Sequence, residues 1–582
     1  MRIEQVPFVD DAVRLWGRSD PRHSNWPVTY VINGTDEIYV GESRNASRRM
    51  AQHLAAERNS SMTELRVIVD DTFNKSACLD LESRLIELLD GDNRFRVLNR
   101  NAGITNADYY NRAQYREAFR EIFEHLRAEG LFTQGIEAIE NSELFKLSPF
   151  KALTEGQASA VEDILTGFFD ELDRNEQSLS VIEGAPGTGK TVVAIYLIKL
   201  LRDIGRDGPL GEEESDSIFA DFFTPEHRAA AAALRIGFVI PQQSLRSSVQ
   251  RVFRHSPGLS DVRVLDPFAV GEDDEVFDLL IVDEAHRLNQ RANQPSGVQN
   301  KRFSEINLRL FGADEDSYTQ LDWIRARSTH HILLLDREQS VRPADLSDSA
   351  VRAILAEASQ AKRRYSLTTQ MRVRAGTDYV DYIRSVLAGE SPALPDVGDY
   401  ELRFFDDLGD MHDLLRVRER EHGLARLVAG FAWPWVSKRD PARFDIEHGG
   451  RRLRWNSTAK DWINSRSALD EVGSIHTVQG YDLNYAGVII GPELRFDPAQ
   501  GRLTISRADY HDTKGKENNP RLGIVYSDAD LQIFINNVYR VLLTRGMRGT
   551  FVYVCDPELR EYLRPFFTVA ERSSGTPDNT GN

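Results

Sequence analysis

The chain has 582 residues, of which 41% are hydrophobic and 28% are charged, and its formal net charge is −18 at pH 7. This length exceeds what one hydrophobic core supports, so we expect about three to four domains, and the composition excludes a disordered or fibrous protein. The acidic total argues mildly against nucleic acid as a partner, because phosphate binding usually shows as excess Lys and Arg, but local basic clusters remain.

Cysteine usage and the absence of long apolar runs favour a cytoplasmic protein. The two cysteines, Cys78 and Cys555, lie far apart and offer neither a disulfide framework nor zinc-ligand spacing, which fits a reducing compartment. Residues 1–25 contain no signal-peptide core, and no apolar run reaches membrane length. We therefore expect no membrane as a partner.

Residues 25–105 have the pattern of a small α/β module. The hairpin turn signal Asn33-Gly34 separates two short runs that are typical of strands. The strands are expected at residues 28–32, 37–40 and 65–69, followed by an apolar-faced helix at residues 77–89.

Five polar residues of this module suit the cleavage of a phosphodiester. They are Tyr30, Tyr39, Arg49, His53 and Glu82. Such cleavage needs a hard cation bound by oxygen, a fixed positive charge on the transition state, and a base. The alternative is that the tyrosines pack the sheet and that Glu82 is a solvated helix residue.

In type and spacing, these residues resemble the GIY-YIG nuclease family from residue 28 to residue 99. The first signature triplet is Val28-Thr29-Tyr30 and the second is Tyr39-Val40-Gly41. The chain departs from the family at Thr29, where Ile is usual, and at Glu42, where the repair-nuclease branch has Lys. The second departure puts phosphate affinity at that position in doubt.

The resemblance also implies a role for each of the five residues. Tyr30, with Tyr39 nearby, would activate the water, and Arg49 would stabilise the pentacovalent phosphate. Glu82 would be the sole protein ligand of one Mg²⁺, and His53 would assist proton transfer or hold the phosphate.

The pattern of residues 106–149, which follow this module, predicts a helical connector to which we assign no chemistry.

Residues 179–191 carry the GxxxxGK[ST] pattern between a buried strand and a helix. The backbone N–H groups of such a loop can wrap a triphosphate, while Lys190 reaches the β- and γ-phosphates and Thr191 holds Mg²⁺. The expected contacts are Gly184, Ala185, Pro186, Gly187, Thr188, Gly189, Lys190 and Thr191. The chain is therefore predicted to bind and hydrolyse ATP.

Polar residues at other strand and helix ends complete the expected nucleotide site. Residues 277–282 form an apolar run that leads into Asp283 and Glu284, so Asp283 would hold Mg²⁺ with Thr191 and Glu284 would polarise the water. Gln157 would read the adenine, with an ordinary helix-start residue as the alternative. Asp336 and Gln339 follow another apolar strand and can sense the γ-phosphate.

Three later motifs match those of superfamily 1 helicases in order and character. They lie at residues 367–372, 474–482 and 541–546. The resemblance implies two RecA-like lobes that close on ATP, with Arg372 and Arg545 as arginine fingers. Gln479, beside Gly480, would couple the nucleotide to the grip on nucleic acid.

Within that class, residues 150–560 resemble the Schlafen-like DNA/RNA helicase family. The motifs that carry the resemblance are the phosphate loop, Ala432-Trp433-Pro434-Trp435, residues 476–482 and residues 539–546. Trp433 and Trp435 could stack on bases, although a packed core position is the favoured interpretation.

These patterns predict an α/β chain in which a small nuclease module precedes two parallel-sheet P-loop lobes. The expected segments are an irregular lead (1–24), a GIY-YIG nuclease domain (25–105), a helical connector (106–149), the first RecA-like lobe (150–350), the second RecA-like lobe with insertions (351–570) and a disordered tail (571–582).

The predicted function is that of an ATP-dependent helicase or translocase with an N-terminal Mg²⁺-dependent endonuclease. DNA is favoured over RNA as the substrate, and DNA processing or antiviral (anti-phage) defence follows by fold-level analogy alone. The alternatives are an ATP-driven sensor or regulatory module whose nuclease fold only binds, and an RNA-directed helicase. A homo-oligomer and a defence-system partner subunit both remain open.

Overall fold

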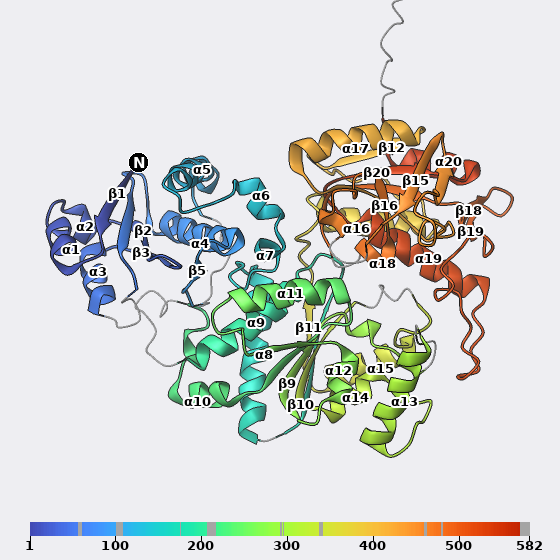
Figure 1. The fold of residues 1–582 in the computed structure, drawn as a ribbon, viewed down its shortest axis with the longest axis horizontal. Coiled ribbons are helices and arrows are strands. Elements are labelled where there is room, and N and C mark those ends of the chain that lie inside the picture. The colour runs from blue at the N-terminus through green and yellow to red at the C-terminus, as the bar shows by residue number, and fades with distance from the viewer. Residues whose placement is uncertain are drawn as a thin grey trace, which may run out of the picture.

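The structure is a computed structural model that describes residues 1–55, 61–100, 109–174, 176–206, 217–291, 294, 296–336, 342–458, 462–478 and 481–570. Three α/β units follow one another along the chain, and a group of short helices lies where they meet (Figure 1). In the part of the chain described, no helix is long and apolar enough to cross a membrane. The expected disordered tail, residues 571–582, lies outside the described residues.

The N-terminal module is a five-stranded sheet with helices on both faces. Its strand order is β1-β4-β2-β3-β5, and only the β3–β5 pair is parallel. Strand β2 is buried along its whole length and β3 nearly so, which explains their continuous apolar runs. The elements are β1 (Arg2–Pro7), α1 (Asp10–Gly17), α2 (Arg22–Asn25), β2 (Val28–Asn33), β3 (Glu37–Ser43), α3 (Ala46–Ala55), β4 (Glu64–Val69), α4 (Lys75–Asp92) and β5 (Arg96–Val97).

The expectation of an irregular lead at residues 1–24 is wrong. Strand β1 pairs antiparallel with β4, from Arg2 opposite Val69 to Pro7 opposite Glu64, and helix α1 buries Val13. Because β1 is the edge strand of the sheet, all of its side chains except that of Val6 stay at least partly exposed, and three of its six residues are polar. The strand therefore lacks the apolar alternation by which a strand is recognised in a sequence.

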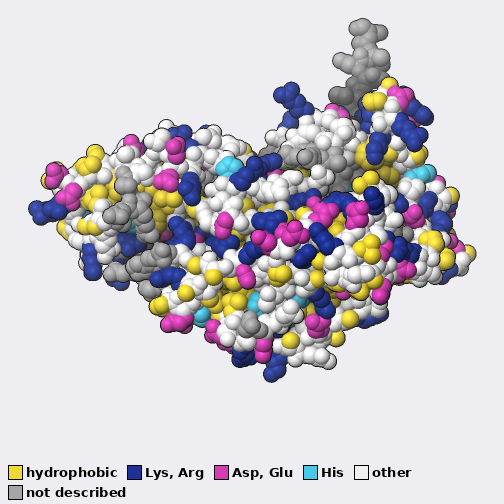
Figure 2. Space-filling view, turned by 60° about the horizontal axis from the view of Figure 1, so that its bottom comes forward, with side chains coloured by type: hydrophobic (Ala, Val, Ile, Leu, Met, Phe, Trp, Pro, Cys, Tyr) yellow, Lys and Arg dark blue, Asp and Glu magenta, His cyan; other side chains and the backbone are white. Residues whose placement is uncertain are grey.

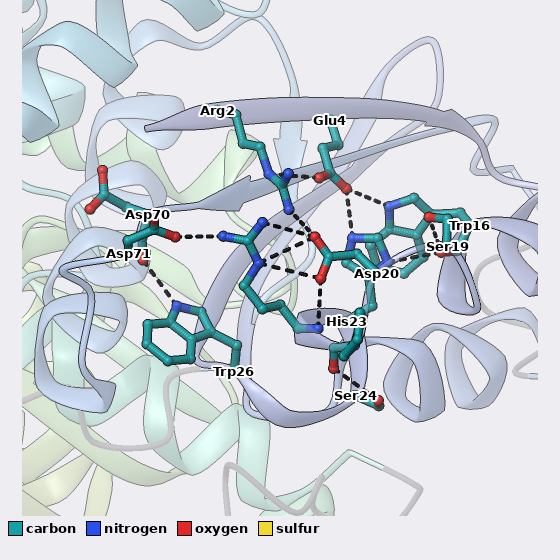
Figure 3. Close-up of polar contacts among 12 residues, drawn as sticks. Arg2, Glu4, Trp16, Ser19, Asp20, His23, Ser24, Trp26, Asp70 and Asp71 are labelled. Carbon is teal, nitrogen blue, oxygen red and sulfur yellow. Dashed lines mark hydrogen bonds and ion pairs between the residues drawn. The ribbon is translucent and has the colours of Figure 1, made fainter.

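A polar network ties this N-terminal edge together (Figure 3). The Glu4 carboxylate accepts a hydrogen bond from Trp16 Nε1 at 2.7 Å and lies 2.8 Å from His23 Nε2. Asp20 pairs with the guanidinium groups of both Arg2 and Arg22. The network fixes α1 and α2 against β1, so the lead is part of the folded module.

The connector consists of one long helix and two short ones: α5 (Arg112–Ala128), α6 (Ile136–Asn141) and α7 (Glu143–Lys146). The apolar face of α5, including Phe119 and Phe123, packs into the same core as helix α4. Helices α6 and α7 lie between the N-terminal module and the two lobes (Figure 1). The predicted helical character of this segment is confirmed.

The first lobe is a six-stranded, wholly parallel sheet with strand order β11-β6-β10-β9-β7-β8. Its strands are β6 (Ser178–Gly184), β7 (Ile236–Val239), β8 (Arg263–Leu265), β9 (Phe277–Val282), β10 (Ser328–Leu335) and β11 (Arg364–Leu367). Its helices are α8 (Glu155–Arg174), α9 (Lys190–Ile204), α10 (Pro225–Ala233), α11 (Gln243–His255), α12 (Pro267–Glu272), α13 (Gly297–Phe311), α14 (Gln320–Ala326) and α15 (Asp348–Gln360).

The expected end of the first lobe at residue 350 is too early. Strand β11 pairs in parallel with β6, the strand that leads into the phosphate loop, so this lobe extends to Leu367. As an edge strand, β11 has only Leu367 fully buried, and its polar sequence gives no strand signal.

The second lobe is built on an eight-stranded sheet with strand order β14-β15-β16-β13-β17-β20-β12-β21, in which only β14 and β15 pair antiparallel. The predicted hairpin within residues 490–530 is confirmed by β18 (Leu494–Asp497) and β19 (Arg502–Ile505). The sheet strands are β12 (Glu401–Phe405), β13 (Ala425–Ala429), β14 (Ile446–His448), β15 (Arg451–Trp455), β16 (Glu471–Ser474), β17 (Leu483–Ile490), β20 (Gly546–Val554) and β21 (Thr568–Val569). The helices are α16 (Gly376–Leu387), α17 (Leu408–His422), α18 (Ile475–Val478), α19 (Asp528–Leu543) and α20 (Pro557–Leu563).

The surface of the molecule carries both signs of charge. Figure 2 shows acidic and basic side chains intermixed over the face in view. The net charge of −18 therefore does not gather into one acidic patch on this face.

Trp433 and Trp435 lie half-buried against the core of the second lobe and near the ring of Trp455, which supports a packing role.

A buried carboxyl in the second lobe makes the stability of the protein depend on pH. Glu493 is 1% exposed and accepts a hydrogen bond from the Tyr539 hydroxyl. Burial raises its pKa to about 7. The folded lobe therefore holds a proton that the unfolded chain releases above its ordinary pKa of about 4.5, so stability falls as pH rises between these two values.

We predict that Glu493→Gln removes this dependence. Relative to the variant, the wild type should lose on the order of 3 kcal/mol of stability between pH 4.5 and pH 8, measured by urea unfolding. The exposed Glu447→Gln is the matched control and should follow the wild type throughout. Parallel curves for wild type and Glu493→Gln would show that Glu493 does not titrate in this range.

Candidate nucleotide site and candidate nuclease cluster

A cavity of about 420 Å³ lies where the phosphate loop of the first lobe faces the second lobe and the connector. This volume falls within the range typical of small-molecule sites. Its lining contains seven Lys and Arg side chains against five Asp and Glu. The positive balance suits a polyanion such as a nucleoside polyphosphate.

The phosphate loop links β6, which ends at Gly184, to α9, which begins at Lys190. Gly187 and Gly189 have φ values of 85° and 80°, a left-handed region that strains other residues. A Cβ added at Gly187 would lie 2.1 Å from Gln370 Oε1. Both the backbone conformation and the close neighbour therefore require glycine there.

The residues after β11 hold this loop from the outside. Gln370 Nε2 donates to the Pro186 carbonyl at 2.8 Å, and the Met371 amide donates to the Gly187 carbonyl at 2.8 Å. Within the loop, Thr188 Oγ1 donates to the Ala185 carbonyl at 2.9 Å. The loop is thus shaped by the segment that leads into the second lobe.

The two polar side chains at the start of α9 point to different partners. Lys190 Nζ donates to the Gly184 carbonyl at 2.7 Å and to the Ala185 carbonyl at 3.1 Å, and lies 3.8 Å from Asp336 Oδ2. Thr191 Oγ1 donates to Asp283 Oδ2 at 2.8 Å. A hydroxyl beside a carboxylate is the oxygen set with which P-loop proteins hold Mg²⁺, so these residues fit the ion.

Two acidic residues at the end of β9 differ in their electrostatics. Burial, followed by the nearby Glu284 charge, raises the pKa of Asp283 to about 6. Burial also acts to raise the pKa of Glu284, but the contact with His286 holds it below its ordinary value. Glu284 also has a φ of 48°, a strained conformation for a residue other than glycine and one that is often found at functional sites.

His286 fixes the position of Glu284. The Asp336 amide donates to His286 Nδ1 at 3.3 Å, and His286 Nε2 lies 3.0 Å from Glu284 Oε2. A carboxylate held in the ionised state beside the Mg²⁺-binding pair can accept a proton from an attacking water.

Two arginines beyond the first lobe line the same cavity: Arg372 lies on the segment between the lobes, and Arg545 belongs to the second lobe. Arg372 pairs with the Asp482 carboxylate, and Arg545 Nη1 donates to the Tyr481 carbonyl at 3.0 Å. Burial, followed by the charge of Arg372, lowers the pKa of Arg545 to about 9. Crowded, desolvated guanidinium groups of this kind gain the most from a bound anion.

The remaining expected nucleotide contacts are placed differently. Gln157 Nε2 donates to the Thr188 carbonyl at 2.9 Å, and its Oε1 accepts from the Thr154 amide at 3.0 Å, so both ends of its amide are bound within the protein. The cavity lining does not include Gln157. Gln339, Gln479 and Gly480 lie outside the described residues.

In the N-terminal module, the structure brings together four of the five expected nuclease residues. The Tyr30 hydroxyl lies 2.9 Å from His53 Nε2 and accepts from Arg49 Nε at 3.3 Å. The rings of Tyr39 and His53 lie 4.9 Å apart. Residues on β2, β3 and α3 thus form one cluster, the tyrosine–histidine cluster.

The fifth residue, Glu82, comes from helix α4 and is half-buried. The pKa of Cys78 is raised to about 12, chiefly by burial and further by the charges of Glu42 and Glu82. Glu42 is itself buried on β3, with Lys75 Nζ 4.0 Å from its Oε1. Glu82 therefore lies close to Cys78, on the helix that covers β2 and β3.

The connector also contributes to the cavity, which the sequence motifs do not indicate. Lys146 of the connector and Lys151, five residues later, lie in its wall, as do Arg374 of the inter-lobe segment and Arg548 of the second lobe. None of these four belongs to a motif of fixed spacing, and only the folded arrangement brings them to the phosphate loop.

A family model matches most of the two-lobe region. Residues 177–556 match the family described as "Schlafen group 3, DNA/RNA helicase domain". The uncharacterised protein YPL245W of Saccharomyces cerevisiae is 27% identical over 423 residues, which cover 68% of this chain and 85% of that protein. A solved DEAD-box helicase bound to ssRNA and UDP-BeF is 11% identical, with 78% of this chain and 80% of that chain covered and a TM-score of 0.31.

A glycine in the second signature triplet provides a test of the tyrosine–histidine cluster. A Cβ added at Gly41 would lie 2.3 Å from Cζ of Tyr30, whose ring is fully buried and cannot move aside. We predict that Gly41→Ala destabilises the module by roughly 1–3 kcal/mol, because overpacking forces strain on the neighbours. Hydrogen exchange of the β2 and β3 amides measures this loss.

The matched control for Gly41→Ala is Gly297→Ala at the start of α13, where an added Cβ meets nothing within 4 Å. This variant should leave exchange in β2 and β3 unchanged. Equal protection in both variants would mean that the Tyr30 ring is not held against residue 41.

Proposed function

The chain belongs to the Schlafen group 3 DNA/RNA helicase family, and from this premise we propose that it is an ATP-hydrolysing, nucleic-acid-dependent motor whose N-terminal module cuts nucleic acid. The observation that carries the motor proposal is one cavity shared by the phosphate loop, Arg372 of the inter-lobe segment and Arg545 of the second lobe. P-loop motors place their nucleotide in this way, because the second lobe then completes the site only when the lobes close.

The proposed roles in ATP hydrolysis follow from the charges around this cavity. The phosphate-loop backbone and Lys190 bind the phosphates, and Thr191 and Asp283 hold Mg²⁺, which neutralises developing charge on the phosphate oxygens. Glu284 takes the proton of the attacking water. Arg372 and Arg545 stabilise the transition-state charge, while Gln339, Gln479 and Gly480 keep their proposed supporting contacts. Gln157 would contact the adenine only by giving up its hydrogen bonds to Thr188 and Thr154.

The proposed nuclease mechanism uses the tyrosine–histidine cluster and Glu82. Contact of the Tyr30 hydroxyl with both His53 and Arg49 supports its role as the group that activates water, because a cation and a proton acceptor both favour the phenolate. Arg49 would stabilise the phosphate and Glu82 would hold Mg²⁺, with Tyr39 beside them. DNA is the favoured substrate, and DNA processing or anti-phage defence is the proposed context.

A physical advantage supports the fusion of the two activities. A nuclease tethered to a motor stays at high effective concentration beside the strand that the motor exposes. The second candidate function is a nuclease fold that binds without cutting. The buried acidic residue Glu42 on β3 favours it, because a negative charge near the cluster would repel a phosphodiester.

We predict that Lys190→Ala and Glu284→Gln separate nucleotide binding from hydrolysis. Lys190→Ala should weaken ATP binding and lower turnover on the order of 100-fold or more, since it removes a preorganised phosphate donor. Glu284→Gln should bind ATP normally and lose turnover about 100-fold or more, since it removes the base. Exposed Lys301→Ala is the control, measured by the same phosphate-release assay.

The nuclease proposal is tested by cleavage of supercoiled plasmid with Mg²⁺, with and without ATP. We predict that wild type cuts, that Glu82→Ala does not, and that Lys190→Ala loses only the part of cleavage that depends on ATP. Intact plasmid in the presence of normal DNA-stimulated ATP hydrolysis would instead support the binding-only module, or RNA as the substrate.

A further inference from the structure

The connector is bonded to the second lobe at the rim of the nucleotide cavity. Lys146 Nζ, at the end of α7, donates to the Asp482 carbonyl at 3.2 Å. Asn141, at the end of α6, accepts from Asn484 Nδ2 at 2.9 Å and donates to the His422 carbonyl at 2.9 Å. Lys146, Asn141 and Asp482 all line the cavity, so these bonds lie within the site itself.

The same two short helices are also tied to the first lobe. Glu143 Oε2 lies 3.1 Å from Arg251 Nη1 on α11, at the first turn of α7. Leu144 and Leu147 pack against the apolar core of that lobe. Any movement of one lobe relative to the other must therefore strain or shift the connector.

On its third side, the connector packs against helix α4 of the N-terminal module. Arg84 of α4 pairs with Glu140, and the Thr133 amide donates to Asp92 Oδ2 at 3.0 Å. A Cβ added at Gly91 would lie 2.8 Å from both Ile139 Cγ2 and Phe145 Cβ. The two elements are in direct contact, and α4 is the helix that carries Glu82.

We propose that the connector forms the third wall of the nucleotide site, and that Lys146 is a positioning residue. Through Lys146, binding of the γ-phosphate by Arg372 alters the contact between the connector and helix α4. This inference rests on the proposed ATPase function. It assigns to a segment outside both lobes a part in nucleotide recognition.

The argument depends on the charges around Asp482. Its carboxylate pairs with Arg372, and its own backbone carbonyl accepts from Lys146, whose ammonium group also interacts with the carboxylate. One partly buried carboxylate thus interacts with Arg372 and Lys146, and the charge of Arg545 acts on it as well. When Arg372 turns to a γ-phosphate, Asp482 keeps Lys146 as its counter-charge, and the attraction between α7 and the second lobe increases.

Removal of the Lys146 charge should have two effects that would not follow if this lysine only stabilised the fold. Without the charge of Lys146, Asp482 would attract Arg372 more strongly, and release of Arg372 would leave this carboxylate with the charge of Arg545 alone. Affinity for nucleotides with a γ-phosphate should then fall, whereas affinity for ADP, which does not need Arg372, should change little. The link between the lobe interface and α4 should also be lost.

The test measures the affinity of the full chain for ADP and for a non-hydrolysable ATP analogue, both with Mg²⁺. Lys146→Gln should weaken binding of the ATP analogue about tenfold and that of ADP less than about threefold, consistent with the loss of one charge-assisted contact. Lys146→Arg should restore the affinity. Lys301→Gln on exposed α13 is the matched control and should match the wild type.

A second readout is hydrogen exchange in α4. The ATP analogue should change the protection of α4 amides in the wild type and not in Lys146→Gln. If Lys146→Gln fails to fold, Arg84→Ala is used instead, because it removes the ion pair between α4 and the connector. It should keep the affinity for the ATP analogue and lose the change in α4.

The outcomes separate this inference from the function on which it rests. If wild type binds the ATP analogue, Lys190→Ala does not, and Lys146→Gln binds both nucleotides like wild type, the motor stands and the inference is wrong. Equal weakening of ADP and ATP analogue by Lys146→Gln would also overturn it, because it indicates general damage. A wild-type chain that binds neither nucleotide would overturn both proposals.

Discussion

The arrangement of this protein depends on the contact between the phosphate loop and the segment that follows strand β11. That segment hydrogen-bonds the carbonyls of Pro186 and Gly187 through Gln370 and Met371, and helix α16 of the second lobe begins five residues after Met371, at Gly376. Arg372 lies on it and faces the same cavity. Arg372 and the inter-lobe connection are thus one continuous segment, and hydrogen bonds join this segment to the phosphate loop, so a ligand that changes the loop acts directly on the connection to the second lobe.

Electrostatics in the cavity point to the kind of ligand that it accepts. Burial raises the pKa of Asp283 to about 6, and burial with the charge of Arg372 lowers the pKa of Arg545 to about 9. Each shift means that the ionised form of the group is raised in free energy when no ligand is bound. A magnesium–nucleotide complex brings a cation to the carboxylate and anions to the arginines, and so relieves both costs.

The N-terminal module is linked to the nucleotide cavity by the packing of helix α4 on the connector and not by shared site residues. Helix α4 covers strands β2 and β3, which carry Tyr30 and Tyr39, and its C-terminal half packs on the connector that walls the cavity. A rigid helix with both contacts gives a mechanical route between two sites that share no residue. Under the proposed function, this helix would connect the motor to the nuclease module.

The phosphate loop, the Asp283–Glu284 pair and the tyrosine–histidine cluster could be predicted from the sequence, because local chemistry fixes the residue types and spacing. Strands β1 and β11 could not, because edge strands tolerate polar residues and lose the apolar pattern. The contact of Lys146 could not be predicted either, because its partner Asp482 lies 336 residues further along the chain. Contacts of that separation follow from packing and leave no motif.

The most direct test of the account is the distance between the lobes, measured by electron spin resonance on labels at Lys301→Cys in α13 and Arg452→Cys in β15. Both native cysteines are buried, and the two chosen positions are exposed, so labelling is selective. The account predicts that Mg²⁺ with a non-hydrolysable ATP analogue shifts the distance distribution, and that Lys190→Ala abolishes the shift. An unchanged distribution in the wild type at saturating nucleotide would contradict it.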